Sequence, residues 1–226
     1  MNTLKMIEVE HVYKSFQLGG TCVEVLKDIN LRIDRGAFIS IMGPSGSGKS
    51  TLLYLMGGLD SVTQGMICVN GVEIQKLNDE AESRMRRNDI GFIFQAYNLI
   101  DNLTLEENIL LPALLEGKKK KAVLPQAEAL MERVGILKRR NHTPKELSGG
   151  EQQRTAIARA LINSPAVLFA DEPIGNLDSK SGKEVLELLR DINREKGITV
   201  LMVTHSEEST RYGNQVIRLR DGAIVA

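Results

Sequence analysis

The sequence contains no tryptophan, only two cysteines and no net charge. Its 226 residues include 29 lysines and arginines against 29 aspartates and glutamates. This balance gives the protein no overall field that would attract nucleic acid or an anionic membrane surface. Cys22 and Cys68 are isolated and lack the spacing of a metal site, so we expect both to be reduced. Partners must therefore be recognised through local contacts, and we expect no nucleic acid among them.

Long apolar segments are absent as well. Residues 1–10 contain no apolar stretch typical of a signal peptide. No uninterrupted apolar run approaches the ~20 residues of a membrane-spanning helix. Hydrophobic residues make up 42% of the chain and charged residues 26%, which is ordinary for a globular protein. We therefore expect a cytosolic protein with a sizeable hydrophobic core.

What the sequence does contain is a glycine-rich segment between an apolar strand and a helix. Residues 43–51 read GPSGSGKST, with apolar residues at 38–42 before them and 52–56 after them. Such a loop turns backbone N–H groups inward, and the helix that it opens adds a positive end, so the segment suits a phosphate group. A plain glycine-rich turn would explain the glycines, but not Lys49 and Ser50 at these offsets. In this pattern Lys49 reaches the β- and γ-phosphates and the Ser50 hydroxyl holds Mg²⁺. We therefore predict that the nucleotide is bound by Gly43, Pro44, Ser45, Gly46, Ser47, Gly48, Lys49, Ser50 and Thr51.

Two kinds of apolar pattern alternate along the chain. Residues 7–12 and 23–33 alternate between apolar and polar, which predicts a short antiparallel sheet. Residues 166–170 and 198–203 are apolar throughout, which is typical of parallel strands buried on both faces. From residue 104 to about 164 the pattern is helical. The chain is therefore predicted to be α/β with an all-helical insert. Shorter strands are predicted at 66–69, 72–74, 90–94, 216–219 and 223–225, and further helices at 79–87 and 183–195.

Two carboxylates follow the apolar strand 166–170. The carboxyl ends of strands are where open α/β sheets place their ligands. Asp171 is suited to the Mg²⁺ shell, usually through water, and Glu172 to polarising an attacking water as general base. Two acidic residues that simply end a strand are common, but beside a phosphate-binding loop the catalytic interpretation is favoured.

A second glycine motif, LSGGEQQR, occupies residues 147–154. Ser148 and Glu151 have the spacing of a capping box, which predicts a helix that runs to about Ile162. The start of that helix offers backbone N–H groups and a hydroxyl to an anion. Alone, this motif would indicate only a helix start.

Together these motifs resemble the nucleotide-binding subunit of an ATP-binding-cassette (ABC) transporter over essentially the whole chain. GPSGSGKST matches the Walker A loop, LSGGEQQR the signature, AVLFADEP the Walker B strand with its glutamate, and NLDS the D-loop. Gln95 and His205 occupy the Q-loop and switch positions. The resemblance implies a P-loop NTPase core with a mixed, mainly parallel sheet, an N-terminal antiparallel β subdomain and an inserted α-helical subdomain. It also implies one ABC ATPase domain over 1–226, with its core at 1–94 and 166–226 and the helical subdomain at about 95–165.

The resemblance further implies a head-to-tail pair of chains with two ATP molecules between them. Ser148, Gly149 and Gly150 of one copy would contact the γ-phosphate held by the other, and Asp178 would link the two sites. His205 would hold Glu172 and the water in line, which suits phosphoryl transfer. The implied catalytic residues are Glu172, His205 and Gln95, and the implied Mg²⁺ ligands are Ser50, Gln95 and Asp171.

Adenine is held in this family by an aromatic residue near the N-terminus. The stretch VYKSF offers Tyr13 and Phe16, and the family spacing favours Phe16. Either ring could instead belong to the core, so both alternatives stay open.

The residues in and around these motifs are most similar to those of ATPases of the macrolide-exporter, lipoprotein-release and antimicrobial-peptide-resistance group. Such an ATPase works on an integral-membrane permease from the inner face of the cell membrane and moves its outer domain. An alternative is an ATPase that regulates a membrane partner in cell-wall remodelling or division without transport. A soluble ABC ATPase of DNA repair or translation would need a coiled-coil insert or a second cassette. An enzyme of small-molecule phosphorylation would leave the signature unexplained.

Overall fold

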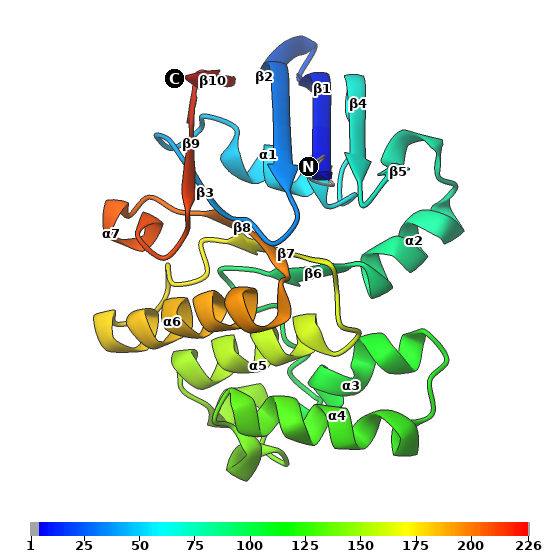
Figure 1. The fold of residues 1–226 in the computed structure, drawn as a ribbon, viewed down its shortest axis with the longest axis vertical. Helices are drawn as coiled ribbons and strands as arrows, with labels where there is room; N and C mark the ends of the chain where they lie inside the picture. Colours follow the sequence, from blue (N-terminus) through cyan, green and yellow to red (C-terminus); the bar gives the residue numbers. More distant parts are fainter. Residues whose placement is uncertain (1–4, 226) are drawn as a thin grey trace.

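The computed structural model describes residues 5–225 and contains two β-sheets with helices around them (Figure 1). A four-stranded sheet has the order β2-β1-β4-β5, and a six-stranded sheet has the order β10-β9-β3-β8-β7-β6. The strands are β1 (Lys5–Leu18), β2 (Thr21–Asp34), β3 (Phe38–Met42), β4 (Gln64–Val69), β5 (Val72–Glu73), β6 (Ile90–Ile93), β7 (Val167–Asp171), β8 (Thr199–Val203), β9 (Gln215–Arg220) and β10 (Ala223–Val225). The helices are α1 (Lys49–Met56), α2 (Asp79–Asn88), α3 (Leu105–Leu115), α4 (Lys120–Arg133), α5 (Gly149–Leu161), α6 (Ser179–Lys196) and α7 (Glu207–Thr210), with 3₁₀ turns at Ile74–Lys76, Leu137–Arg139 and Pro144–Glu146.

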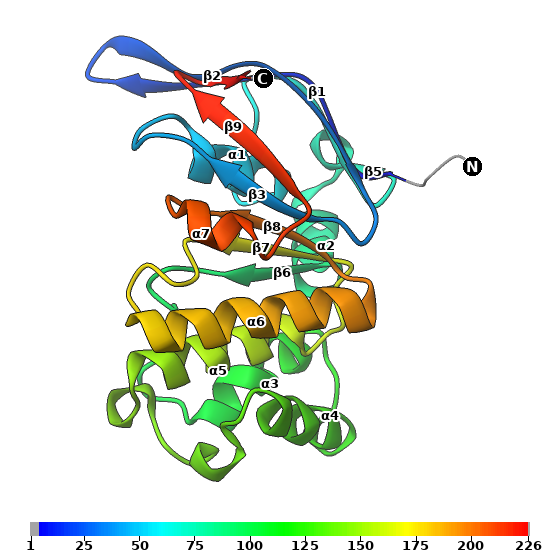
Figure 2. The same ribbon diagram turned by 60° about the vertical axis from the view of Figure 1, so that its left-hand side comes forward.

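The six-stranded sheet is parallel from β9 to β6 and carries the site. Strands β3, β7 and β8 are buried at every position. They read as apolar runs because both faces of the sheet are covered. In Figure 2 the four-stranded sheet and α1 lie on one side of this sheet, and α5 and α6 lie on the other. Alternate side chains of β8 therefore enter different cores: Val200 and Met202 join the helical side, and Leu201 and Val203 join the side of α1.

The four-stranded sheet is longer than the sequence pattern predicts. Strands β1 and β2 have 14 residues each, so the expectation of a short sheet was wrong in length. Their pairing contains register shifts, and His11 and Asp28 adopt positive φ values of 49° and 47°. Irregularities of this kind bend a ribbon and interrupt the alternation of apolar and polar residues. A turn at Gly19 and Gly20 joins the two strands.

Helices α3, α4 and α5 follow β6 and precede β7, which confirms the predicted fold class. The helix α3 begins with a capping box in which Thr104 accepts a hydrogen bond from the N–H of Glu107. The three helices pack on one another around Ile109, Ala127 and Ile157. They form the lower layer in Figure 1 and join the sheet through α5.

The helices and the two cysteines bear on the expectations about membrane spans and thiols. Within residues 5–225, no helix is both long enough and apolar enough to cross a bilayer. Cys22 is exposed and Cys68 is half-buried, and both are free thiols.

Candidate functional site

The glycine-rich loop joins the end of β3 to the start of α1, and its glycines are required by their surroundings. A Cβ atom on Gly43 would lie 2.0 Å from the carbonyl oxygen of Leu219. Gly48 has φ 95° and forms the N-cap of α1, and no side chain caps that helix. A Cβ atom there would lie 2.7 Å from Cδ2 of Leu26. The first N–H groups of α1 therefore have no capping side chain as a hydrogen-bond acceptor. They are free to bind an anion.

Lys49 is folded back onto this loop. Its Nζ donates a hydrogen bond of 2.8 Å to the carbonyl of Pro44, and the residue is 5% exposed. Burial lowers the pKa of Lys49, while Glu172 and Asp171 act in the opposite direction. Among the described residues, the buried hydroxyl of Ser47 has no hydrogen-bond partner. A bound phosphate would provide acceptors for both the Lys49 ammonium and the Ser47 hydroxyl.

Asp171 lies at the end of β7 and accepts hydrogen bonds from two side chains of α1. The Ser50 hydroxyl donates to its Oδ1 at 2.8 Å, and the Tyr54 hydroxyl donates to its Oδ2 at 2.6 Å. Ser50 and Tyr54 are four residues apart, so they share one face of the helix. Burial and then the bond to Asp171 raise the pKa of Tyr54, which keeps this hydroxyl a donor. Tyr54 was not predicted from the sequence, although its i, i+4 spacing after Ser50 was available as a signal.

The residues at this point fit a magnesium ion. The structure brings together the hydroxyl of Ser50 and the carboxylate of Asp171, both hard oxygen ligands of the kind that Mg²⁺ takes. Within residues 5–225 there is no cluster of three or more His, Cys, Asp or Glu side chains that could hold a metal. Mg²⁺ does not need such a cluster, because it usually binds one or two carboxylates together with waters and substrate phosphates.

Glu172 and His205 meet at the ends of adjacent strands. Nε2 of His205 lies 2.5 Å from Oε1 of Glu172. The pairing of β7 with β8 in parallel, with Asp171 opposite Val203, places the two chain segments side by side. Glu172 has φ 47°, an uncommon conformation for a residue other than glycine, and its N–H is held by the carbonyl of Val203 at 3.1 Å. The Glu172 side chain is 24% exposed and that of His205 47%, so both are open to water.

Gln95 follows β6 and is bonded to Asn176 instead of to the magnesium ligands. Its Nε2 donates to Oδ1 of Asn176 at 3.3 Å, and Nδ2 of Asn176 donates to the carbonyl of Gln95 at 2.9 Å. A Cβ atom on Gly175 would lie 2.6 Å from Nε2 of Gln95. The structure therefore ties Gln95 to the segment after Glu172, through an asparagine that the sequence analysis did not single out.

The predicted cap at the start of α5 is present, and α6 also begins with a well-formed cap. The Ser148 hydroxyl accepts the N–H of Glu151 at 3.3 Å, and the N–H and hydroxyl of Ser148 both donate to the Glu151 carboxylate at 2.9 Å. The N–H of Ser148 holds the pKa of Glu151 below its usual range. Asp178 caps α6 and accepts the N–H groups of Lys180 and Ser181, each at 3.0 Å. Within residues 5–225 no hydrogen bond joins the start of α5 to the loop 43–51.

The signature glycines have a close neighbour that the sequence did not indicate. A Cβ atom on Gly149 would lie 2.8 Å from the hydroxyl of Tyr97, and one on Gly150 would lie 3.2 Å from Oγ of Ser181. The Tyr97 hydroxyl also lies 3.5 Å from the carbonyl oxygen of Asn176. Residues after β6, after β7 and at the start of α5 therefore form one contact group.

The aromatic candidates for adenine differ in exposure. Phe16 lies on β1 and is 37% exposed, whereas Tyr13 is half-buried. The strand β2 pairs with β1 and presents Val25 and Leu26 to Gly48 at the start of α1. Phe16 is thus an accessible ring on a strand pair that packs against the glycine-rich loop.

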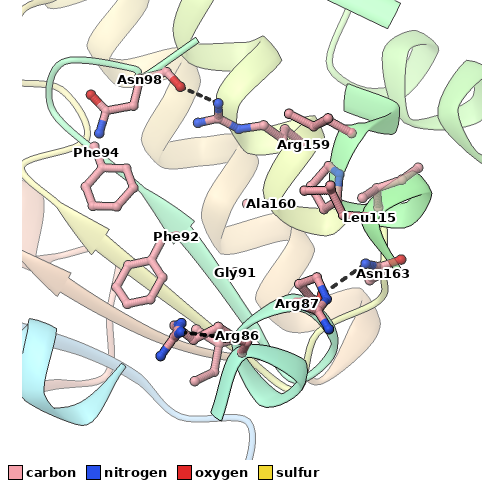
Figure 3. A pocket seen from close by; sticks show the side chains of 15 residues that line it. Arg86, Arg87, Gly91, Phe92, Phe94, Asn98, Leu115, Arg159, Ala160 and Asn163 are labelled. Carbon is pink, nitrogen blue, oxygen red and sulfur yellow. Dashed lines mark hydrogen bonds between the residues drawn. The ribbon is translucent and has the colours of Figure 1, made fainter. Parts of the chain in front are cut away.

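A groove of about 460 Å³ opens along β6, the edge strand of the six-stranded sheet, between α2, α3 and α5 (Figure 3). Its apolar wall includes Phe92, Phe94 and Leu115. Arg159 enters it from α5 and donates hydrogen bonds to the backbone carbonyls of Tyr97, at 2.8 Å, and of Asn98. Burial lowers the pKa of Arg159. No aspartate or glutamate is among the residues that line the groove, which are Ser83, Arg86, Arg87, Ile90, Gly91, Phe92, Phe94, Asn98, Leu111, Pro112, Leu115, Arg159, Ala160, Ile162 and Asn163.

Comparisons with known proteins agree on one family. The protein family described as ABC transporter matches residues 26–175. The chain is 48% identical over 219 residues to the macrolide export ATP-binding/permease protein MacB of Bdellovibrio bacteriovorus, covering 97% of this chain but 33% of that protein. It therefore spans about a third of this relative. It is 45% identical over 221 residues to the lipoprotein-releasing system ATP-binding protein LolD of Geobacter metallireducens, covering 98% of each.

A solved structure matches over nearly its whole length. The dimeric ABC transporter cassette MJ0796 of Methanocaldococcus jannaschii superimposes with a TM-score of 0.91 at 41% identity, covering 98% of this chain and 97% of that one. The same cassette is known in a dimeric post-hydrolysis state bound to ADP and Pi, again with a TM-score of 0.91.

Proposed function

This chain belongs to the ABC transporter family, and from that premise we propose that it is an ATPase subunit that drives a membrane permease by mechanotransmission. The chain is an ATP-binding cassette of the type that hydrolyses ATP. We propose a single ATPase domain over 1–226, with its core at 1–94 and 166–226 and a helical subdomain at about 95–165. The observation that carries the proposal is the meeting of the Ser50–Asp171 and Glu172–His205 pairs beside the glycine-rich loop.

The loop 43–51 would bind the phosphates of ATP. Its N–H groups and the Ser47 hydroxyl would donate to phosphate oxygens, and Lys49 would exchange the carbonyl of Pro44 for the β- and γ-phosphates. Ser50 and Asp171 would hold Mg²⁺, which when bound supplies charge neutralisation at the phosphates. Tyr54 would orient the Asp171 carboxylate.

Glu172 would act as the general base for the attacking water. Its carboxylate is exposed enough to reach a water, and its contact with His205 fixes its direction. His205 would donate from its ring to the γ-phosphate region and hold Glu172 in line. Gln95, now bonded to Asn176, would exchange that partner for the nucleotide site when ATP is present.

A second copy would complete each site. Within the described part of one chain, the start of α5 makes no hydrogen bond to the loop 43–51. Ser148, Gly149 and Gly150 would therefore bind an anion held by another copy. The dimeric form of MJ0796 supports a pair of chains, and we propose that the pair is head-to-tail, so that these residues meet the ATP of the partner. Asp178 would lie between the two sites.

The groove beside β6 would receive a helical segment of the permease. Its apolar wall fits an amphipathic helix. Arg159 is bonded to neutral carbonyls, and the lining contains no carboxylate, so an acidic residue on the docking segment would be complementary. The names of the MacB and LolD relatives support an export or release system. Under this proposal the chain sits peripherally on the cytoplasmic face of the cell membrane, and regulation of a cell-wall partner without transport is the competing function.

Capture of the partner tests this proposal. Tagged Glu172→Gln protein with Mg·ATP is used to capture partners from solubilised membranes, with Lys49→Ala as the control that should not form the ATP-bound state. We expect a multi-helix membrane protein with a large outer domain to co-purify only with the first variant. Recovery of a cell-wall regulator would favour the competing function, and recovery of soluble partners alone would contradict the permease assignment.

A further inference from the structure

Lys14 is a buried lysine outside the catalytic cluster. It lies on β1 and is 7% exposed, an unusual position for a side chain that is almost never buried unless it is paired. Its Nζ donates hydrogen bonds of 2.7 Å to Oδ1 of Asp60 and 2.7 Å to the carbonyl of Ser61. These two contacts hold the ammonium group in one place.

The fixed ammonium lies over the ring of Phe16. The distance from Nζ to the ring centroid is 4.6 Å, within the range of a cation–π contact. Lys14 and Phe16 are two residues apart on one strand, so their side chains lie on the same face. The Lys14 cation lies over one face of the Phe16 ring. Phe16 is nevertheless 37% exposed. The cation therefore restrains one face of the ring, and the residue remains accessible to a ligand.

Lys14 and its partners lie near both ends of α1, the helix that follows the glycine-rich loop. Lys14 pairs with Leu26 across the sheet, and Leu26 packs against Gly48 at the N-cap of α1. Asp60 and Ser61 come shortly after the other end of α1. Lys14 thus fixes the position of Phe16 relative to the loop that would hold the phosphates.

We propose that Lys14 is a positioning residue for the nucleotide base and acts through Phe16. The proposal rests on the proposed role of Phe16 as the platform for adenine. The ammonium holds the ring still, so less freedom is lost when a base stacks on it. It also draws electron density toward one face, which makes the open face a better partner for an electron-rich purine.

The test compares two probes that differ in the base. The affinities of Mg·ATP and of Mg·tripolyphosphate are measured by calorimetry for the parent, Lys14→Met and Lys14→Arg. We expect Lys14→Met to weaken ATP binding roughly threefold to tenfold, the size of one cation–π contact, and to leave tripolyphosphate unchanged. Lys14→Arg keeps the cation and should recover most of the ATP affinity. Equal weakening of both probes would overturn the proposal, because it would indicate a general structural effect.

The matched control is Lys5→Met. Lys5 is on the same strand and is paired with Asp34 at 2.6 Å, but within residues 5–225 it makes no cation–π contact. This variant should bind both probes as the parent does. If Lys14→Met does not fold, Asp60→Ala removes the carboxylate that anchors the ammonium instead, and it should weaken the binding of ATP without affecting that of tripolyphosphate.

A double-mutant cycle separates this inference from the function on which it rests. In a Phe16→Leu background, Lys14→Met should have no further effect on ATP binding. If Phe16→Leu weakens ATP but Lys14→Met does not, the role of Lys14 is wrong and the ATPase assignment stands. If Phe16→Leu has no effect, Phe16 is not the platform, and the proposal falls with it. Unchanged ATP affinity in Lys49→Ala would instead contradict the phosphate-binding loop.

Discussion

At the residue scale, two neighbouring carboxylates have different surroundings and are suited to different tasks. Asp171 is 8% exposed and is fixed by two hydroxyl donors. Glu172 is the next residue, but its backbone turns to a positive φ and its side chain reaches His205 and solvent. The first environment suits a metal shell and the second suits activation of a water.

Replacing Glu172 with glutamine should separate binding from turnover. The amide keeps the shape but cannot accept the proton, so we expect steady-state ATPase activity to fall by about 10² to 10⁴. ATP affinity, measured by equilibrium binding, should be retained. Glu208→Gln, at an exposed position on α7, is the matched control and should keep the parent rate. Hydrolysis at the parent rate by the Glu172 variant would remove this residue as the base.

Replacing Tyr54 with phenylalanine should remove one of the two donors to Asp171. The lost bond to a carboxylate should lower the free energy of unfolding by about 1 to 3 kcal/mol, measured by urea denaturation. The Mg²⁺ concentration that gives half-maximal ATPase activity should rise, because the carboxylate is less well oriented. Tyr212→Phe is a control outside the site. If neither quantity changes, Tyr54 does not orient Asp171.

At the element scale, the sequence was informative wherever one local pattern determines the structure. The buried strands 166–170 and 198–203, the capping box of Ser148 and the strand at 66–69 all occur as predicted. The length of β1 and β2 was not predictable, because their irregularities disturb the period of two. The contacts of Tyr97 and Asn176 join elements far apart in the chain. They depend on the order of strands in the sheet, which no local pattern specifies.

The stabilisation that the Asp178 cap gives to α6 should depend on pH. The N–H of Ser181 holds the pKa of Asp178 below its ordinary value near 3.8. The cap therefore stabilises the fold fully above the pKa of unfolded aspartate, and this stabilisation is lost as the pH falls through the lower folded pKa. We expect Asp178→Ala to lower the melting temperature at neutral pH and to converge with the parent at acidic pH.

Asp178→Asn is the control for this prediction, because it keeps an acceptor that does not titrate. Its melting temperature should stay above that of Asp178→Ala at acidic pH. A difference between Asp178→Ala and the parent that is equal at both pH values would show that the carboxylate charge does not contribute to the cap.

At the scale of the whole molecule, the six-stranded sheet divides the chain into two functional sides. One face packs on α1 and the four-stranded sheet, and the other packs on the helices that include the segment 147–154 (Figure 2). The family motifs in the sequence predicted both sides, including the signature far from the glycine-rich loop along the chain. Local patterns could not predict the groove beside β6, because α2, α3 and α5 form it only in the folded chain.

The central claim is that ATP joins two copies of this chain, with Ser148 of each copy on the nucleotide of the other. The most direct measurement is the molar mass of Glu172→Gln protein by light scattering, with and without Mg·ATP. We expect the mass to change from 25.0 kDa to twice that value on addition of ATP, and not to change in the double variant that also carries Ser148→Arg. A protein that binds ATP and remains at 25.0 kDa, or a dimer that forms equally well with Ser148→Arg, would contradict it.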